Sequence, residues 1–129
     1  MKLRILGIVI AFLSVTSCMK KQVEGVQVVD VVEFESKMKE QNVQLIDVRT
    51  PEEFQEGHLE NAQNMNVMGA DFEAQVANLD KTKPVLVYCK SGGRSAKASE
   101  QLKALGFTNI TDLEGGFTNW SGSGKPVVE

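Results

Sequence analysis

The sequence predicts an α/β fold, in which helices cover both faces of a mostly parallel β-sheet. Segments with a strand pattern alternate with segments with a helix pattern along most of the chain, an order typical of parallel sheets. The run PVLVY at 84–88 is apolar throughout, as expected of a strand that is covered on both faces. A chain of 129 residues has room for one such domain.

The elements can be placed from their apolar patterns and from the residues that bound them. Strands are predicted at 26–30, 43–48, 62–67, 84–88 and 108–113. Helices are predicted at 31–41, between Thr50 and Gly57, at 71–79 with Asp71 as the cap, and from Ser95 to Gly106. The segment 115–120 is expected to form a turn or a short helix, and the residues after it a loose tail.

Two of the predicted helices have clear start signals. Asp30 and Glu33 have the spacing of a capping box at the start of the first helix. Thr50, Pro51 and Glu53 give the helix after 43–48 an N-cap, a proline at its first position and an acidic residue at its third. These signals predict the beginnings of both helices to within a residue or two.

The first 17 residues have the pattern of a secretory signal, with the basic start MKLR followed by a short apolar run. The residues VTSC at 15–18 resemble the lipobox of bacterial lipoproteins. That resemblance implies a signal peptide at 1–17, a lipid on Cys18 and a tether at 18–25. The protein is then expected to be exported and held on a lipid membrane, facing the periplasm or the cell exterior. An ordinary signal peptide with an incidental Cys18, or an uncleaved anchor, remains the alternative.

Charge and cysteine content narrow the classes of partner. The chain has 17 acidic and 14 basic residues and a net charge of −3, which gives no basic face for nucleic acid. It has two cysteines. If Cys18 carries a lipid, Cys89 has no disulfide partner, and an unpaired thiol in an exported protein indicates reactivity. A buried, inert cysteine is the alternative.

The loop YCKSGGRS at 88–95 is predicted to bind an anion next to Cys89. It joins a strand end to a helix start, where unpaired backbone N–H groups are available, and two glycines allow positive φ. Such surroundings lower a cysteine pKa from about 8.5 into roughly the 3.5–7.5 range, so Cys89 is expected to be a thiolate nucleophile. The other candidate residues are the substrate-binding Lys90, Ser91, Gly92, Gly93, Arg94 and Ser95, of which Lys90 and Arg94 are expected to attract an anionic substrate.

Three motifs resemble the rhodanese family. They are the Cys89 to Arg94 spacing, LIDVRTPEEFQEGHLENAQNM at 45–65 and LEGGFTNW at 113–120. The resemblance implies a three-layer α/β/α domain over 26–121 with about five strands, followed by a tail at 122–129. It also implies a sulfurtransferase that moves sulfane sulfur, through a persulfide on Cys89, from thiosulfate or a similar anion to cyanide or a thiol. Asn61 stands where the family usually has glycine and is expected to adopt a left-handed turn.

Several other residues are interpreted as structural. Asp47 and Arg49 are expected to support the site as an ion pair that pins neighbouring loops, and His58 to shape a turn. Met65, Met68 and Trp120 are expected to pack in the core or at its rim. No cofactor is expected, and the single histidine with Cys89 cannot supply a metal site.

Two further functions stay open from the sequence. One is a low-turnover sulfur carrier or polysulfide-binding module. The other is a small phosphatase or arsenate reductase, which the loop length disfavours because those related enzymes have one more residue between cysteine and arginine. The physiological donor, the acceptor and the oligomeric state are not predicted.

Overall fold

The computed structural model describes residues 24–129, so the predicted signal peptide, Cys18 and most of the tether lie outside the described residues. The centre of the domain is one parallel sheet with the strand order β1-β5-β4-β2-β3. The strands are β1 (Val26–Val29), β2 (Gln44–Asp47), β3 (Gln63–Asn64), β4 (Val85–Tyr88) and β5 (Ile110–Leu113). This arrangement confirms the predicted α/β sheet.

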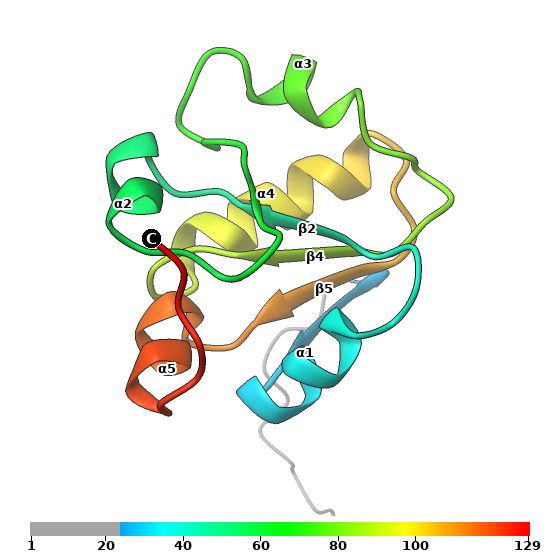
Figure 1. The fold of residues 1–129 in the computed structure, drawn as a ribbon. Helices are drawn as coiled ribbons and strands as arrows, with labels where there is room; N and C mark the ends of the chain where they lie inside the picture. Colours follow the sequence, from blue (N-terminus) through cyan, green and yellow to red (C-terminus); the bar gives the residue numbers. More distant parts are fainter. Residues whose placement is uncertain (1–23) are drawn as a thin grey trace, which may run out of the picture.

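Helices cover both faces of the sheet (Figure 1). They are α1 (Val31–Met38), α2 (Pro51–Glu56), α3 (Phe72–Val76), α4 (Gly93–Ala104) and α5 (Gly116–Gly122). One apolar cluster joins the sheet to α3 and α4, and a second joins the other face to α1 and α5. The domain therefore has the three layers that the sequence predicted.

Strand β4 is the central element, hydrogen bonded to β5 on one side and β2 on the other. All four of its residues are buried. Val85 and Val87 belong to the cluster under α3 and α4, whereas Leu86 and Tyr88 belong to the cluster under α1 and α5. This alternation explains why the segment is apolar throughout. Because β4 is central, the residue after Tyr88 lies in the middle of the row formed by the carboxyl ends of the strands.

The helix starts agree with the sequence in two cases and differ in two. Asp30 accepts a hydrogen bond from the Glu33 N–H, and Thr50 with Glu53 forms a complete capping box. Asp71 precedes α3 but makes no capping hydrogen bond, so that prediction is wrong. Helix α4 begins two residues before Ser95, because Gly92 adopts a left-handed conformation (φ 115°) that turns the chain directly into the helix.

The segment after α5 is not the loose tail that the sequence predicted. The Trp120 indole donates to the Pro126 carbonyl at 2.8 Å, and Val128 and His58 exchange two backbone hydrogen bonds. Lys125 also pairs with Glu35 of α1 at 3.0 Å. These contacts depend on residues far apart in the sequence, so composition alone could not reveal them.

The structure shows the burial of the two methionines and Trp120 and the backbone conformation of Asn61. Met65 and Trp120 are buried as expected, but Met68 is 61% exposed and therefore packs in no core. Asn61 has φ 66°, the left-handed turn expected at that position.

Within residues 24–129, no helix has the length and apolar character needed to cross a membrane.

Candidate active site

The candidate site lies at the carboxyl end of the central strand β4. Cys89 directly follows this strand, and residues 89–92 connect it to α4. The start of α4, the helix α2 and the start of α5 come together at this end of the sheet (Figure 1). Ligands of parallel α/β sheets bind beyond the carboxyl ends of the strands, so the position agrees with a functional role.

The Cys89 sulfur is enclosed by its own loop. Its Sγ accepts a hydrogen bond from the Gly92 N–H at 3.0 Å and lies 3.4 Å from the Ser95 hydroxyl. The residue has no exposed surface and belongs to the apolar cluster under α4. Cys89 is enclosed because the turn at Gly92 folds the chain back over the sulfur. An N–H aimed at Sγ near a helix start stabilises negative charge there.

The predicted substrate-binding residues differ in their placement. Lys90, Ser91 and Gly93 are exposed, whereas Ser95 is buried and its hydroxyl donates to the Gly92 carbonyl at 3.1 Å. Gly92 has positive φ but Gly93 does not, so only the first glycine is needed for the turn. A side-chain carbon at either glycine would meet no atom within 4 Å. The outer side of the loop is thus open.

Arg94 is held in an ion pair that the sequence analysis did not anticipate. Its guanidinium donates to both carboxylate oxygens of Glu53, at 2.6 and 3.0 Å. These bonds lower the pKa of Glu53 to about 2, and the same contact raises the pKa of Arg94. The negative charge of Cys89 also raises the pKa of Arg94, so the guanidinium acts on both groups. The sequence analysis assigned Glu53 only to helix capping, because Arg94, its partner in the ion pair, lies 41 residues away.

The positive charge of Arg94 is therefore largely balanced by Glu53. Lys90 is exposed, and among the ion pairs of residues 24–129 none involves its ammonium group. Lys90 is then the cation of this loop that is available to an anion from solvent. The two cations of the loop, both expected to attract an anion, thus differ in how far Glu53 balances their charge.

Asp47 and Arg49 form the structural ion pair that the sequence predicted. The Arg49 guanidinium donates to Asp47 Oδ2 at 2.7 Å and to the Gly57 carbonyl at 2.6 Å, and it lies over the Phe117 ring at 4.3 Å. Burial disfavours the charge of Arg49, but the hydrogen bonds and charge of Asp47 outweigh it and raise the pKa of Arg49. The pair connects β2, the end of α2 and α5 beside the cysteine loop.

Tyr88 extends this buried cluster to the strand that carries the cysteine. The Leu59 N–H donates to its hydroxyl oxygen at 3.1 Å. Burial, and then the charge and hydrogen bond of Asp47, raise the pKa of Tyr88 far above its usual value, so the hydroxyl stays protonated. Tyr88, the residue before Cys89, is therefore held in place by a hydrogen bond to its own uncharged hydroxyl.

Helix α5 holds the cysteine loop from the other side. The N–H groups of Phe117 and Thr118 donate to the carbonyls of Cys89 and Lys90, at 2.8 and 3.0 Å. Gly116 has φ 56°, and a side-chain carbon there would overlap the backbone of Cys89 and Lys90. The second glycine of the GG motif thus permits close contact between α5 and the loop. The motif was visible in the sequence, but its contact with Cys89 was not.

His58 lies outside these contacts and has the structural role that the sequence predicted. Its Nδ1 is 2.9 Å from the Phe54 carbonyl, and its ring stacks on that of Phe54. Among residues 24–129, no group of three or more histidine, cysteine or acidic side chains is placed to hold a metal ion.

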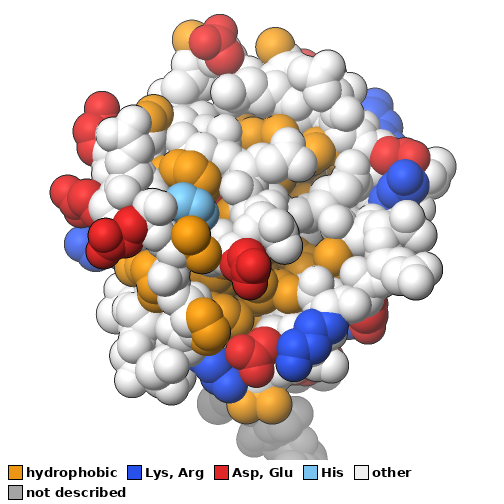
Figure 2. Space-filling model, in the orientation of Figure 1, with side chains coloured by type: hydrophobic (Ala, Val, Ile, Leu, Met, Phe, Trp, Pro, Cys, Tyr) orange, Lys and Arg blue, Asp and Glu red, His pale blue; other side chains and the backbone are white. Residues whose placement is uncertain are grey.

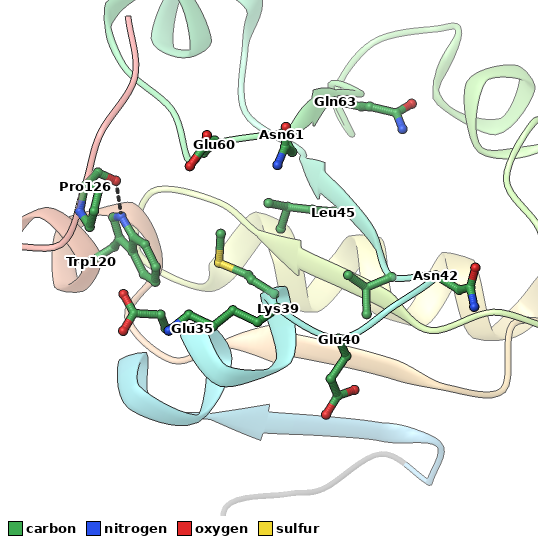
Figure 3. A pocket seen from close by; sticks show the side chains of 12 residues that line it. Glu35, Lys39, Glu40, Asn42, Leu45, Glu60, Asn61, Gln63, Trp120 and Pro126 are labelled. Carbon is green, nitrogen blue, oxygen red and sulfur yellow. Dashed lines mark hydrogen bonds between the residues drawn. The ribbon is translucent and has the colours of Figure 1, made fainter.

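A pocket of about 500 Å³ lies on the α1 side of the sheet, apart from the cysteine loop. Its lining includes the apolar Met38, Leu45 and Trp120 and the acidic Glu35 and Glu60. Figure 2 shows hydrophobic side chains among acidic ones on this face, and Figure 3 shows the pocket side chains coming from α1, β2 and α5. The lining contains no residue of the cysteine loop, no thiol and no imidazole.

Comparison with known proteins agrees with this geometry. The model of the rhodanese-like domain family matches residues 30–123. The chain belongs to this family. It is 42% identical over 92 residues to thiosulfate sulfurtransferase 16, chloroplastic, of Arabidopsis thaliana, a match that covers 64% of this chain and 77% of the relative. It is 34% identical over 83 residues to thiosulfate sulfurtransferase GlpE of Coxiella burnetii, covering 64% and 76% of the two chains.

A solved structure supports the same rhodanese fold. The rhodanese-related protein of Thermoplasma volcanium superposes with a TM-score of 0.70 at 31% identity, covering 79% of this chain and 97% of that one. The relatives named sulfurtransferases support a sulfur-transfer role for this rhodanese domain.

The contact between α5 and the cysteine loop can be tested by Gly116→Ala. The added carbon would overlap the loop backbone in a conformation that disfavours alanine, so we expect a loss of at least about 1–3 kcal/mol in the free energy of unfolding. The rate at which iodoacetamide alkylates Cys89 should also change. Gly122→Ala is the matched control, since it lies in the same helix with open space around it. Equal stability of the two variants would contradict this role of Gly116.

Proposed function

We propose that the protein is a sulfurtransferase that moves sulfane sulfur from thiosulfate or a similar anionic donor to cyanide or a thiol, through a persulfide on Cys89. The observation that carries the proposal is the position of Cys89 at the end of the central strand, with the Gly92 N–H directed at its sulfur at 3.0 Å. This arrangement stabilises a thiolate, which is the nucleophilic form of cysteine.

The proposed reaction has two steps at the same sulfur. The Cys89 thiolate attacks the outer sulfur of thiosulfate, a new S–S bond forms, and sulfite leaves with the electron pair of the bond that breaks. The acceptor then attacks the outer sulfur of the persulfide, and the Cys89 thiolate leaves. No proton or electron from another source is needed, which fits a site without a neighbouring histidine.

Loop residues control access to the sulfur. Because Cys89 has no exposed surface, a donor reaches it only when residues 90–92 shift outward. The open space around Gly92 and Gly93 leaves room for this movement. An arriving anion first meets the exposed Lys90, and it competes with the Glu53 carboxylate for Arg94. We therefore assign Lys90 to capture of the donor and Arg94 to the position nearest the transferred sulfur.

A low-turnover sulfur carrier is the second candidate, and the burial of Cys89 favours it. A persulfide enclosed by the loop would be shielded from thiols in solution and delivered only when the loop opens. A carrier would take one sulfur per chain and form thiocyanate slowly, whereas an enzyme would turn over repeatedly with thiosulfate and cyanide.

We also propose that the chain is exported and held on a membrane by a lipid on Cys18, because VTSC follows a basic and apolar leader. Several acyl chains together hold a protein firmly, at roughly 0.8 kcal/mol per buried methylene. Cys18→Ser should leave the protein uncleaved or release it from the membrane fraction. Fractionation and intact mass of both forms provide the measurement. If the wild type and Cys18→Ser show the same processing by mass and the same distribution between membrane and soluble fractions, Cys18 carries no lipid.

The sulfurtransferase proposal is tested by thiocyanate formation from thiosulfate and cyanide. We expect the wild type to turn over many times and Cys89→Ser to lose all activity, because a serine hydroxyl cannot form the persulfide. Hydrolysis of an aryl phosphate, measured in parallel, should be absent from both proteins. Phosphate hydrolysis that depends on Cys89, without thiocyanate formation, would instead favour a phosphatase.

The role of Lys90 predicts a salt-sensitive donor affinity. Exposed ion pairs contribute about 0.2–1 kcal/mol, so Lys90→Ala should raise the KM for thiosulfate up to about fivefold and leave kcat nearly unchanged. Added salt should raise the KM of the wild type more than that of the variant, since it screens exposed charges. Lys97→Ala removes another exposed lysine, from α4, and serves as the control. If both variants behave alike, net charge rather than Lys90 governs donor capture.

A further inference from the structure

The Glu53 carboxylate is held by its own helix and by Arg94 of the cysteine loop. Its Oε1 accepts hydrogen bonds from the Thr50 hydroxyl at 3.1 Å and from one terminal nitrogen of Arg94 at 2.6 Å. Its Oε2 accepts from the other terminal nitrogen at 3.0 Å. The Arg94 and Glu53 side chains are only 25% and 26% exposed. The contact is therefore a forked ion pair, the strong form of an arginine–carboxylate interaction.

The capping box of α2 keeps Glu53 in this position. Thr50 accepts a hydrogen bond from the Glu53 N–H at 3.3 Å, and the Glu53 carboxylate accepts from Thr50 in return. These contacts lie within the first turn of one helix, so they do not depend on Arg94. The carboxylate is thus a fixed group of α2, and the long arginine side chain is drawn to it.

Arg94 lies between two residues that contact the sulfur. The Gly92 N–H donates to Cys89 Sγ at 3.0 Å, and the Ser95 hydroxyl is 3.4 Å from the same atom. Arg94 is in the first turn of α4, and the start of α4 lies beside α2 at the carboxyl end of the sheet (Figure 1). An anion that approaches the thiol beside Arg94 therefore also approaches Glu53.

Glu53 changes what the loop can select by charge. Coulomb energy is proportional to charge, so an unpaired guanidinium attracts a dianion about twice as strongly as a monoanion. Glu53 repels both in the same proportion, and because it contacts the guanidinium directly it cancels most of this difference. The neighbouring Asp47–Arg49 pair is balanced in the same way, at 2.7 Å. Lys90 takes part in none of the ion pairs of residues 24–129, but it is exposed, so salt screens its charge.

We propose that Glu53 is the positioning residue that sets the charge selectivity of the Cys89 site: by holding Arg94, it removes the preference for dianions that an unpaired arginine would impose. The donors that gain are sulfane compounds with one negative charge, such as thiosulfonates. For these donors the proposal rests on the sulfurtransferase function. The thiolate attacks the outer sulfur, a new S–S bond forms, and a sulfinate leaves with the electron pair of the bond that breaks.

Two alkylating reagents test the selectivity without a sulfur donor. The Cys89 thiolate displaces iodide from neutral iodoacetamide and from anionic iodoacetate, and the ratio of the two rates, read on the Cys89 peptide of the full-length chain, reports selection by charge. Glu53→Gln removes the charge and keeps the capping box, which accepts glutamine as well as glutamate. We expect this variant to raise the iodoacetate-to-iodoacetamide ratio about fivefold, the upper end for a partly exposed charge. Glu52→Gln removes an exposed charge from the same turn of α2 and should leave the ratio near that of the wild type.

Two donors that differ in charge test the consequence for sulfur transfer. Thiosulfate is a dianion and methanethiosulfonate a monoanion, but both offer the same outer sulfur. In Glu53→Gln, the kcat/KM for thiosulfate divided by that for methanethiosulfonate should rise about fivefold over the wild type, whereas Glu52→Gln should match the wild type. A purely structural role for Glu53 would lower both values and leave their ratio unchanged.

Arg94→Gln covers the case in which Glu53→Gln does not fold. It leaves the Glu53 charge without its cation, so both ratios should fall below those of the wild type, and the variant with both substitutions should return toward them. Ratios that stay at the wild-type value in a folded single variant would overturn the proposal. Shifted alkylation ratios without turnover of either donor would support the charge selectivity and contradict the sulfurtransferase function. Turnover of both donors with unchanged ratios would do the reverse.

Discussion

The backbone around Cys89 is held from two sides, and the rest of the site depends on this constraint. Inside the loop, the Gly92 N–H donates to the sulfur at 3.0 Å. Outside it, two N–H groups of α5 donate to the carbonyls of Cys89 and Lys90. Both contacts need glycine, because Gly92 has positive φ and Gly116 must approach the loop backbone closely. The thiol is therefore positioned mainly by the main chain.

Two ion pairs support this loop. The Asp47–Arg49 pair joins β2 to the end of α2 and to the Phe117 ring of α5, the helix that clamps the loop. The Glu53–Arg94 pair joins α2 to the first turn of α4. The Asp47–Arg49 pair is buried, so removing one of its members would leave an uncompensated charge and be costly. We infer that α2 acts as the link between these two pairs and so fixes the helices on either side of Cys89.

Local signals in the sequence were sufficient for most of the fold. The Thr50–Glu53 capping box lies within one turn of helix, so its spacing is visible in the sequence. The run at 84–88 is apolar throughout, which predicts that this strand is buried on both faces. Contacts between distant segments were not predictable in this way. The Glu53–Arg94 pair, the burial of Cys89 and Asp112, and the bound tail all depend on which elements lie side by side. Helix α4 also starts earlier than its apolar pattern, since the conformation of Gly92 decides its first turn.

The most direct test of the account is the intact mass of the protein after incubation with thiosulfate. We expect the wild type to gain the mass of one sulfur atom, to lose it when cyanide is added, and to regain it with fresh thiosulfate. Cys89→Ser should gain none. Sulfur that persists on the serine variant, or a wild type that gains no sulfur while remaining folded, would contradict the claim that Cys89 is the atom through which sulfur passes.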